Sequence, residues 1–439
     1  MRALILNAAN RLGDLAGRVR SALETQLTAR GYQVTNRDLV GLSIPDCLGD
    51  FGCWVVTPGI CVHQGPHREI AREVIGSDLI LLLSPLTFGG YSSAAKKALD
   101  HLIPLISPFF STVGGETHHI PRYPRFPDLL AVGLTEGPDP QGTRVFERLV
   151  TRNALNMHAL RFASPVLART EAADLDAKVL GWLAELAAAR PAAPGGESLD
   201  LSAEATLPVV ALRRALLLLG SPRAARSTSA SLAEHLAASL SARGVSVTTE
   251  RLHALLRADP ELRGLCASLP EYDLVVFASP LYVDSLPGPV TEALELLWAG
   301  RAAAPAARRP RLLAVVNCGF PEAVHGDTAL AIYRRFAIES GLDWVGGLAV
   351  GGGGMIDGRP LQELGGRARA LTRALSLTAD AVAGGGIVPA EAERLARQRA
   401  VPAWLYRFFA DWGFKKAAGK RGTSARLMER PHPLADGSR

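Results

Sequence analysis

The chain has 439 residues, of which 48% are hydrophobic and 21% are charged, and this composition excludes a disordered or fibrous protein. Its length predicts two or three domains, and its five cysteines, an odd number in a large chain, favour a reducing cytoplasm over a disulfide framework. Residues 390–439 hold eleven Lys and Arg against five Asp and Glu, which accounts for the whole formal charge of +6, so the main body is not expected to bind nucleic acid.

The most informative pattern is an internal repeat, because four segments of the first half recur in the same order in the second half. They are RALILN (2–7) with RALLLLG (214–220), ARGYQV (29–34) with ARGVSV (242–247), DLILLLSPLTFGG (78–90) with DLVVFASPLYVDS (273–285), and LLAVGLTEG (129–137) with LLAVVNCGF (312–320). The same domain therefore occurs twice. The first copy holds eighteen extra residues around its cysteine-rich segment and twelve more around 107–127.

Each copy alternates short apolar runs with amphipathic segments. Residues 15–30 place Leu15, Val19, Leu23 and Leu27 four apart, and residues 231–243 repeat that spacing, so both segments are predicted helices with one apolar face. Continuously apolar strands between such helices predict an α/β fold with a doubly wound parallel sheet in each copy. The expected organisation is a domain over 1–190, a linker over 191–208, a domain over 209–385 and a helical tail over 386–439.

The loop after the first strand of the second copy, GSPRAARSTSASLAEHL (220–236), predicts a phosphate site. It offers hydroxyl and guanidinium donors just ahead of a helix, where backbone N–H groups attract an anion. The predicted contacts are Ser221, Arg223, Ser227, Thr228 and Ser229. The alternative is a Ser/Thr helix cap with surface arginines. The equivalent loop of the first copy (7–20) has no Ser or Thr and carries Asp14, which predicts a weaker site.

Two further loops in each copy suit a planar ring. SPLTFGG (84–90) and SPLYVDS (279–285) combine a proline with an aromatic residue, which offers either a flat wall for a ring or a turn packed by its own side chain. The loop NCGFP (317–321) has Asn and Gly where a backbone would approach a ligand closely.

Together, GSPRAARSTS, SPLYVDSLPGPVTEALE and NCGFPEA resemble the flavodoxin-like NAD(P)H-dependent FMN reductase superfamily. The first copy, with its cysteine segment and its SPL loop, is similar to the branch related to iron–sulfur flavoproteins. The resemblance implies two tandem flavodoxin-like domains, with the FMN phosphate on the five residues given above. It implies ring contacts at Pro280, Leu281, Tyr282, Val283, Asn317, Cys318 and Gly319, and in the first copy at Pro85, Leu86, Thr87, Phe88 and Gly89.

The function this implies is a cytoplasmic oxidoreductase that passes electrons from NAD(P)H through FMN to a quinone-like, azo or protein acceptor. No side chain is predicted to act as a catalytic acid. The alternative is a non-catalytic flavin-binding electron carrier or a degenerate scaffold. The resemblance also implies flavin pockets near subunit contacts, which favours either a homodimer or a pairing of the two copies within one chain.

The segment CLGDFGCWVVTPGIC (47–61) carries Cys47, Cys53 and Cys61. It resembles the cysteine motif of the iron–sulfur branch, but Asp50 stands at the second cysteine position, and a [4Fe–4S] cluster typically takes four thiolates. No metal is therefore predicted, and zinc held by the three cysteines and one carboxylate is the less favoured alternative. Apolar packing or a reactive thiol is the favoured interpretation, and redox cycling between Cys47 and Cys53 stays open.

The tail segment PAWLYRFFADWGFKK (402–416) interleaves aromatic residues with cations. A helix docked on a domain is favoured over an amphipathic helix that lies on an anionic membrane.

Overall fold

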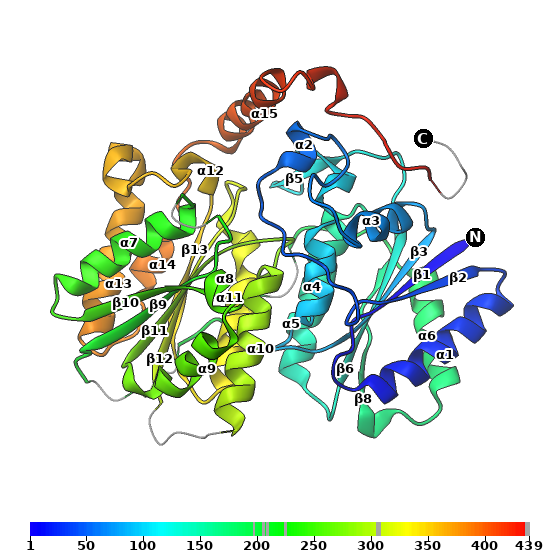
Figure 1. Cartoon of the computed structure of the whole chain (residues 1–439), viewed down its shortest axis with the longest axis horizontal. Coiled ribbons are helices and arrows are strands. Elements are labelled where there is room, and N and C mark those ends of the chain that lie inside the picture. Colours follow the sequence, from blue (N-terminus) through cyan, green and yellow to red (C-terminus); the bar gives the residue numbers. More distant parts are fainter. Residues whose placement is uncertain (196–197, 204–206, 208–209, 224–225, 304–308, 435–439) are drawn as a thin grey trace. The chain divides into compact units, whose positions relative to one another are not determined.

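The computed structural model describes residues 1–195, 198–203, 207, 210–223, 226–303 and 309–434 (Figure 1). The chain forms two compact units. The first unit comprises Met1–Glu197 and Arg407–Arg439, and the second comprises Ser198–Tyr406. Each unit is an α/β domain of the flavodoxin-like kind, so the predicted fold class is confirmed.

The first domain holds a parallel sheet in the order β2-β1-β3-β6-β7, with β8 also paired to β6. The sheet strands are β1 (Arg2–Asn7), β2 (Gln33–Asp38), β3 (Leu79–Pro85), β6 (Asp128–Thr135), β7 (Phe162–Ala163) and β8 (Val166–Ala168). A separate antiparallel hairpin is formed by β4 (Ile106–Val113) and β5 (Glu116–Pro121). The helices are α1 (Gly13–Ala29), α2 (Gly52–Val55), α3 (His67–Ile75), α4 (Ser93–Asp100), α5 (Pro140–Asn156) and α6 (Leu175–Ala188).

The second domain repeats this topology as a parallel sheet in the order β10-β9-β11-β12-β13. Its strands are β9 (Arg214–Leu219), β10 (Ser246–Arg251), β11 (Leu274–Pro280), β12 (Arg311–Asn317) and β13 (Asp343–Val350). Its helices are α7 (Thr228–Ser241), α8 (Leu252–Leu255), α9 (Asp259–Ser268), α10 (Gly288–Ala303), α11 (Asp327–Glu339), α12 (Gly353–Ile356), α13 (Arg369–Ala383) and α14 (Ala390–Ala396).

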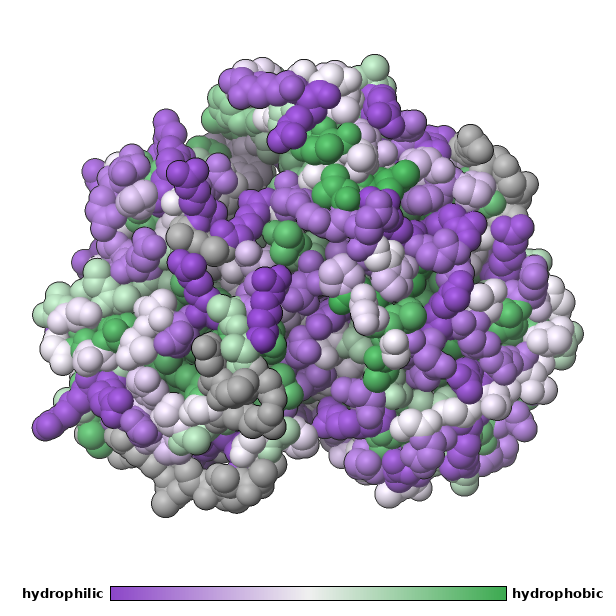
Figure 2. Space-filling model, in the orientation of Figure 1, coloured by the Kyte–Doolittle hydropathy of each residue, from purple (hydrophilic) through white to green (hydrophobic). Residues whose placement is uncertain are grey.

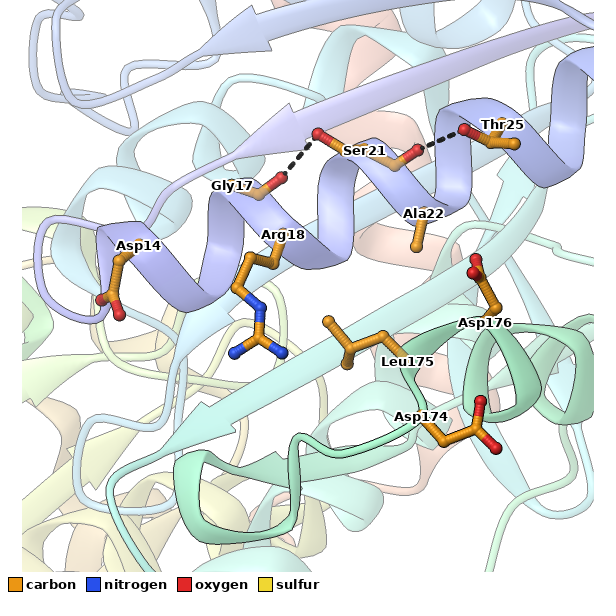
Figure 3. A pocket seen from close by; sticks show the side chains of 9 residues that line it. All are labelled: Asp14, Gly17, Arg18, Ser21, Ala22, Thr25, Asp174, Leu175 and Asp176. Atoms are coloured by element: carbon orange, nitrogen blue, oxygen red, sulfur yellow. Dashed lines mark hydrogen bonds between the residues drawn. The ribbon is translucent and has the colours of Figure 1, made fainter.

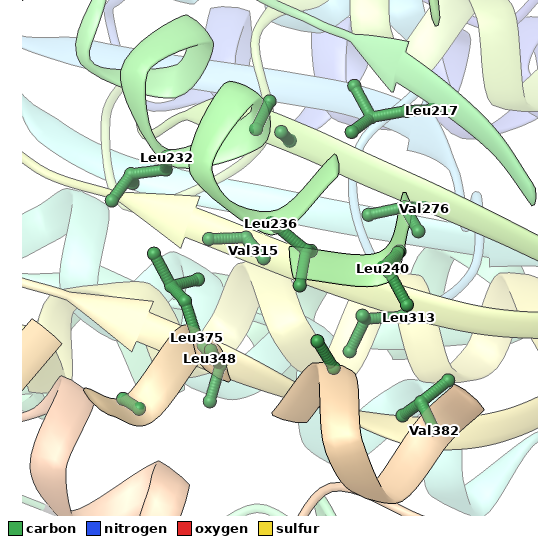
Figure 4. Packing of buried hydrophobic residues seen from close by; sticks show 14 of the residues in the cluster. Leu217, Leu232, Leu236, Leu240, Val276, Leu313, Val315, Leu348, Leu375 and Val382 are labelled. Carbon is green, nitrogen blue, oxygen red and sulfur yellow. The ribbon is translucent and has the colours of Figure 1, made fainter. Parts of the chain in front are cut away.

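The predicted apolar helix faces form the cores. On α1 the four residues spaced four apart are at most 1% exposed, and they pack with α6 on one face of the first sheet. Helices α3, α4 and α5 cover the other face. In the second domain, Leu232, Leu236 and Leu240 of α7 meet α13 over the sheet, as Figure 4 shows. Alternate residues of the strands feed these two-sided cores, as expected for strands buried on both faces.

The two insertions of the first domain contact each other. The cysteine segment contains α2, and the later insertion forms the β4–β5 hairpin, which the sequence did not predict. The indole Nε1 of Trp54 donates to the backbone oxygens of Ile103 at 3.2 Å and Ile106 at 3.0 Å. Because Trp54 is 1% exposed, it fixes the cysteine segment against the chain that leads into the hairpin.

The tail predicted over 386–439 is divided between the two units. Helix α14 packs against α13 and β13, so it is an integral part of the second domain. Helix α15 (Ala403–Gly419) has its first turn in the second unit, and from Arg407 onward the chain belongs to the first. There the buried guanidinium of Arg122 donates to the backbone oxygens of Leu427 at 2.8 Å and Glu429 at 2.9 Å. These bonds offset the cost of burying a cation, and they dock the segment.

One face of α15 is packed and another is exposed. Phe414 lies 5.2 Å from Trp54 between ring centroids, edge to face, whereas four aromatic side chains of the helix are 54–64% exposed: Trp404, Phe408, Phe409 and Trp412. Hydrophobic colour appears among the polar surface where Figure 1 labels α15 (Figure 2). A lipid contact of this face stays a prediction. Within the described part of the chain, no helix is both long enough and apolar enough to cross a bilayer.

Candidate functional site

The carboxyl ends of the parallel strands in the second domain place the three predicted loops at one sheet edge. Strand order reverses between β9 and β11, and ligands of such sheets bind beside that point. Contacts join the loops directly. The Ser229 hydroxyl donates to Asn317 Oδ1 at 2.7 Å, and the Leu281 N–H donates to the Asn317 carbonyl at 2.8 Å. Asn317 therefore links the predicted phosphate loop to the predicted ring loop.

The hydroxyls of the predicted phosphate loop form hydrogen bonds to backbone groups of the protein itself. Ser227 caps α7, its oxygen accepting from the Ala230 N–H at 3.1 Å. The Thr228 hydroxyl donates to the Gly353 carbonyl at 2.8 Å, and Ser221 accepts from the Arg223 N–H at 3.3 Å. Capping, given above as the alternative to phosphate binding, is thus observed. Arg223 of the same loop is an exposed residue, and a guanidinium is a strong hydrogen-bond donor to anions.

The turn after β11 has a strained backbone. Tyr282 and Ser285 exchange backbone hydrogen bonds of 2.9 and 3.1 Å, which forces φ to 51° at Val283 and 52° at Asp284. Positive φ is uncommon for any residue with a side chain and costs most for a β-branched one such as valine. The first domain keeps the same turn, with φ 54° at Phe88. The two copies therefore share a left-handed turn after the corresponding strand, and the second copy has a side chain at both turn positions.

The third loop presents backbone rather than side chain. Cys318 is 4% exposed, and its thiol lies 3.3 Å from the Phe320 carbonyl, so a ring at this edge would meet the peptide groups of residues 317–319. The Gly319 carbonyl accepts a hydrogen bond from the hydroxyl of Tyr406, in the first turn of α15. The first turn of α15 is therefore docked at the third loop, which follows β12.

Sequence reasoning missed a buried cluster of titratable side chains beside this loop. His325 is 0% exposed, its Nδ1 lies 3.2 Å from Asp284 Oδ1, and its Nε2 lies 3.8 Å from Glu322 Oε2. Asp284 belongs to the strained turn and Glu322 follows the third loop, so the imidazole ties the two together. These residues are up to 41 positions apart in sequence, and no spacing rule would have joined them.

In the first domain the equivalent positions are covered. Thr87, Phe88 and Gly89 are buried, and a Cβ on Gly89 would lie 2.7 Å from the Cβ of Val145 in α5. In the second domain, by contrast, four predicted ring residues are partly exposed: Pro280, Leu281, Tyr282 and Val283. The other predicted residues of the first domain are Pro85, which is buried, and Leu86, which is partly buried.

The first loop of the first domain is also unlike a phosphate cradle. Helix α1 has no side-chain cap, and Leu12 precedes it with φ at 60°. Asp14 in the first helical turn is paired with Arg169, whose Nη2 lies 3.0 Å from Asp14 Oδ1, and this hydrogen bonding lowers the pKa of the carboxyl group. An ionised carboxylate therefore stands where a phosphate would have to bind.

All five cysteines of the chain are free thiols. Burial raises the pKa of Cys47 to about 12 and the pKa of Cys53 well above its ordinary value. Because the thiolate is the reactive form, these two side chains are poor nucleophiles as they stand, and apolar packing is the interpretation that their surroundings support.

A shallow hollow on the first domain contains none of the predicted site residues. Figure 3 shows it between α1 and the start of α6, where Ser21 and Thr25 hydroxyls bond to carbonyls of their own helix at 3.0 Å. Arg18 beside it donates to the Ala172 carbonyl at 2.9 Å. The hydrogen bonds of these three side chains are made to backbone carbonyls of the domain itself, so the hollow is not a candidate site for a ring or a phosphate.

Comparison with known proteins yields one family. The family model described as NADPH-dependent FMN reductase matches residues 1–116 and 213–326, which is more than half of the chain and covers both domains. None of the curated proteins matches the chain.

Solved structures with a similar fold have low identity to this chain. An FMN-dependent NADH-azoreductase from Bacillus anthracis str. Ames Ancestor, in complex with FMN, is 11% identical and aligns over 39% of this chain and 100% of its own, with a TM-score of 0.30. An NAD(P)H:quinone oxidoreductase from Methanothermobacter marburgensis is 16% identical over 38% of this chain and 96% of its own, with a TM-score of 0.31. At these scores neither structure bears on what this chain binds.

Proposed function

The chain belongs to the NADPH-dependent FMN reductase family, and we propose that its second domain binds one FMN and passes electrons from NAD(P)H to a quinone-like, azo or protein acceptor. We further propose, from the spacing of Cys47, Cys53 and Cys61, that the first domain is related to the iron–sulfur flavoprotein branch.

The observation that supports the second domain as the flavin site is the contrast between the two copies. The ring loop after β11 is partly exposed next to the exposed Arg223, whereas its counterpart after β3 is buried under α5 and faces a loop that carries Asp14. A phosphate dianion needs cationic and N–H donors, and a ring needs an open apolar wall. Of the two copies, only the second offers both among its described residues.

The residues present fit FMN by the chemistry of their donors. Arg223, Ser221 and the N-terminus of α7 would hold the phosphate, since α7 is fourteen residues long and its dipole favours an anion. Pro280 and Tyr282 would flank the ring, and the backbone at Asn317–Gly319 would face its edge. Bound FMN supplies the chemistry, accepting hydride from the nicotinamide and delivering electrons to the acceptor. The protein would hold these partners in a reactive orientation.

Replacing Arg223 with alanine tests this assignment. Loss of a charge-assisted hydrogen bond to phosphate should raise the dissociation constant for FMN by about 10- to 100-fold. The measurement is the quenching of FMN fluorescence during titration of the purified full chain. Arg11→Ala is the matched control, because Arg11 stands in the equivalent loop of the first domain, and it should leave the affinity unchanged. Unchanged affinity in Arg223→Ala, or a loss confined to Arg11→Ala, would contradict the assignment.

The same sample separates the enzyme from its alternatives. If the chain is an oxidoreductase, NADH or NADPH bleaches the bound flavin under anaerobic conditions. If it is an electron carrier, the flavin binds but neither nucleotide bleaches it. A chain that takes up no FMN is a scaffold, and the proposal fails.

A further inference from the structure

Three side chains of the first domain form a cluster outside the proposed flavin site. Cys61 lies in the cysteine segment, His67 begins α3, and His101 follows α4. One ligand atom from each lies within 4.8 Å of the others. The Cys61 Sγ and the His101 Nδ1 are 3.8 Å apart. In a tetrahedral zinc site, sulfur and nitrogen ligands are separated by roughly 3.6 Å, so this spacing already approaches the bound geometry.

Hydrogen bonds fix the tautomer of both imidazoles. The His101 Nε2 lies 2.8 Å from the Pro45 carbonyl, and the His67 Nε2 lies 3.1 Å from the His63 carbonyl. A carbonyl only accepts, so each Nε2 must carry the proton, which leaves the lone pair on each Nδ1. A backbone carbonyl behind the remote nitrogen is the support that metal-bound histidines typically have.

One of these lone pairs has no partner within the protein. His67 is 1% exposed, and its Nδ1 makes no hydrogen bond. A buried acceptor without a partner is destabilising, and natural proteins rarely leave one without a reason. Neutral imidazole is the form that binds a metal.

The surrounding loop is held in place. Arg68 donates to the His63 carbonyl at 2.9 Å and to the Val62 carbonyl at 3.0 Å, and it thereby fixes the chain between Cys61 and His67. The two imidazoles stack with centroids 3.9 Å apart, so the rings must rotate apart for both Nδ1 lone pairs to point at one ion. Cys61 is partly exposed, which leaves a route for an ion and for a water molecule as a fourth ligand.

We propose that Cys61 Sγ, His67 Nδ1 and His101 Nδ1 bind one Zn²⁺-like ion in the first domain. Thiolate and imidazole are the ligands that zinc prefers, and three of them leave one coordination position open. On binding, the Cys61 thiol gives its proton to solvent and the sulfur donates to the metal. This differs from the expectation of no metal drawn from the sequence, because two of the three ligands lie outside the cysteine segment. Cys47 and Cys53 are not part of this site.

Cobalt and zinc titrations of the untagged, chelator-treated full chain test the proposal. We expect one equivalent of Co²⁺ to bind with a near-ultraviolet thiolate-to-cobalt band, and Zn²⁺ to displace it. Cys61→Ser should abolish the band, and His67→Gln should weaken Zn²⁺ binding by at least about 100-fold, since even outer partners of metal ligands are worth 10–100-fold. Circular dichroism reports whether each variant is folded.

Two controls match these variants. Cys266→Ser removes a partly exposed thiol of the second domain, and His63→Gln removes a nearby imidazole that pairs with Asp50 at 2.7 Å. Both should bind Co²⁺ as the parent chain does. Absence of the band in the parent, a band that survives Cys61→Ser in a folded chain, or iron with acid-labile sulfide in the purified protein would overturn the proposal. Because FMN affinity is not the readout, the result is independent of the proposed flavin site.

Discussion

Lys96→Met should destabilise the first domain by about 3–5 kcal/mol, although it replaces a cation by an apolar side chain of similar length. The Lys96 ammonium lies 2.6 Å from the Asp100 carboxylate one turn along α4, and both side chains are 1% exposed. Removing the lysine leaves Asp100 deeply buried without this partner, in surroundings where water cannot replace it. The free energy of unfolding should be measured by urea denaturation, with the transitions of the two domains fitted separately.

The neighbouring lysine supplies the control. Lys97 lies 3.6 Å from Asp46, and these side chains are 22% and 18% exposed, so Lys97→Met should cost no more than about 1 kcal/mol. In the double variant Lys96→Met/Asp100→Leu most of the lost stability should return, because the buried carboxylate is removed together with the buried cation. Equal effects at 96 and 97 would show that the buried pair is not an important contribution to the stability of this domain.

The repeat explains why so much of the fold could be predicted. Two copies of one pattern reinforce each other. The buried faces of α1 and α7 were recognisable from their spacing, and the strands at 2–7 and 214–219 from their continuous apolar runs. The β4–β5 hairpin lies in an insertion that the second copy lacks, and it had no such support. The position of the tail was predicted from its composition. Composition does not reveal that the buried Arg122 donates hydrogen bonds to carbonyls some 300 residues away.

The site was predictable to a lesser extent, for a similar reason. The sequence placed three loops at one sheet edge because parallel strands must end together, and the link through Asn317 agrees with that. The sequence did not indicate in which copy the loop predicted to contact the ring is exposed, because that depends on how closely α5 approaches Gly89. Nor did it join Asp284 to His325, or Cys61 to His101, since contacts between distant residues follow from packing and not from spacing.

Gly358→Ala should weaken FMN binding by about 100-fold while the second domain stays folded. Gly358 follows α12 with φ at 72°, and a Cβ there would lie 2.7 Å from the backbone carbon of Arg226 and 3.0 Å from the Ser227 nitrogen. Backbone atoms cannot turn aside, so the proposed phosphate loop must shift. A 100-fold loss of affinity corresponds to about 2.7 kcal/mol, which is within the range expected for losing a charge-assisted hydrogen bond to phosphate. Fluorescence titration with FMN measures the effect.

Gly244→Ala separates this loop shift from backbone strain. Gly244 follows α7 with φ at 81°, and a Cβ there would meet nothing within 4 Å, so this variant bears a similar left-handed strain of about 1–2 kcal/mol without touching the loop. Gly358→Ala should therefore lose at least as much stability as Gly244→Ala, because it adds the loop contact to the strain, and only Gly358→Ala should lose FMN. If both bind FMN as the parent chain does, the loop between β9 and α7 is not the phosphate site. If both lose it, strain alone explains the effect, and the loop geometry has no special part in binding.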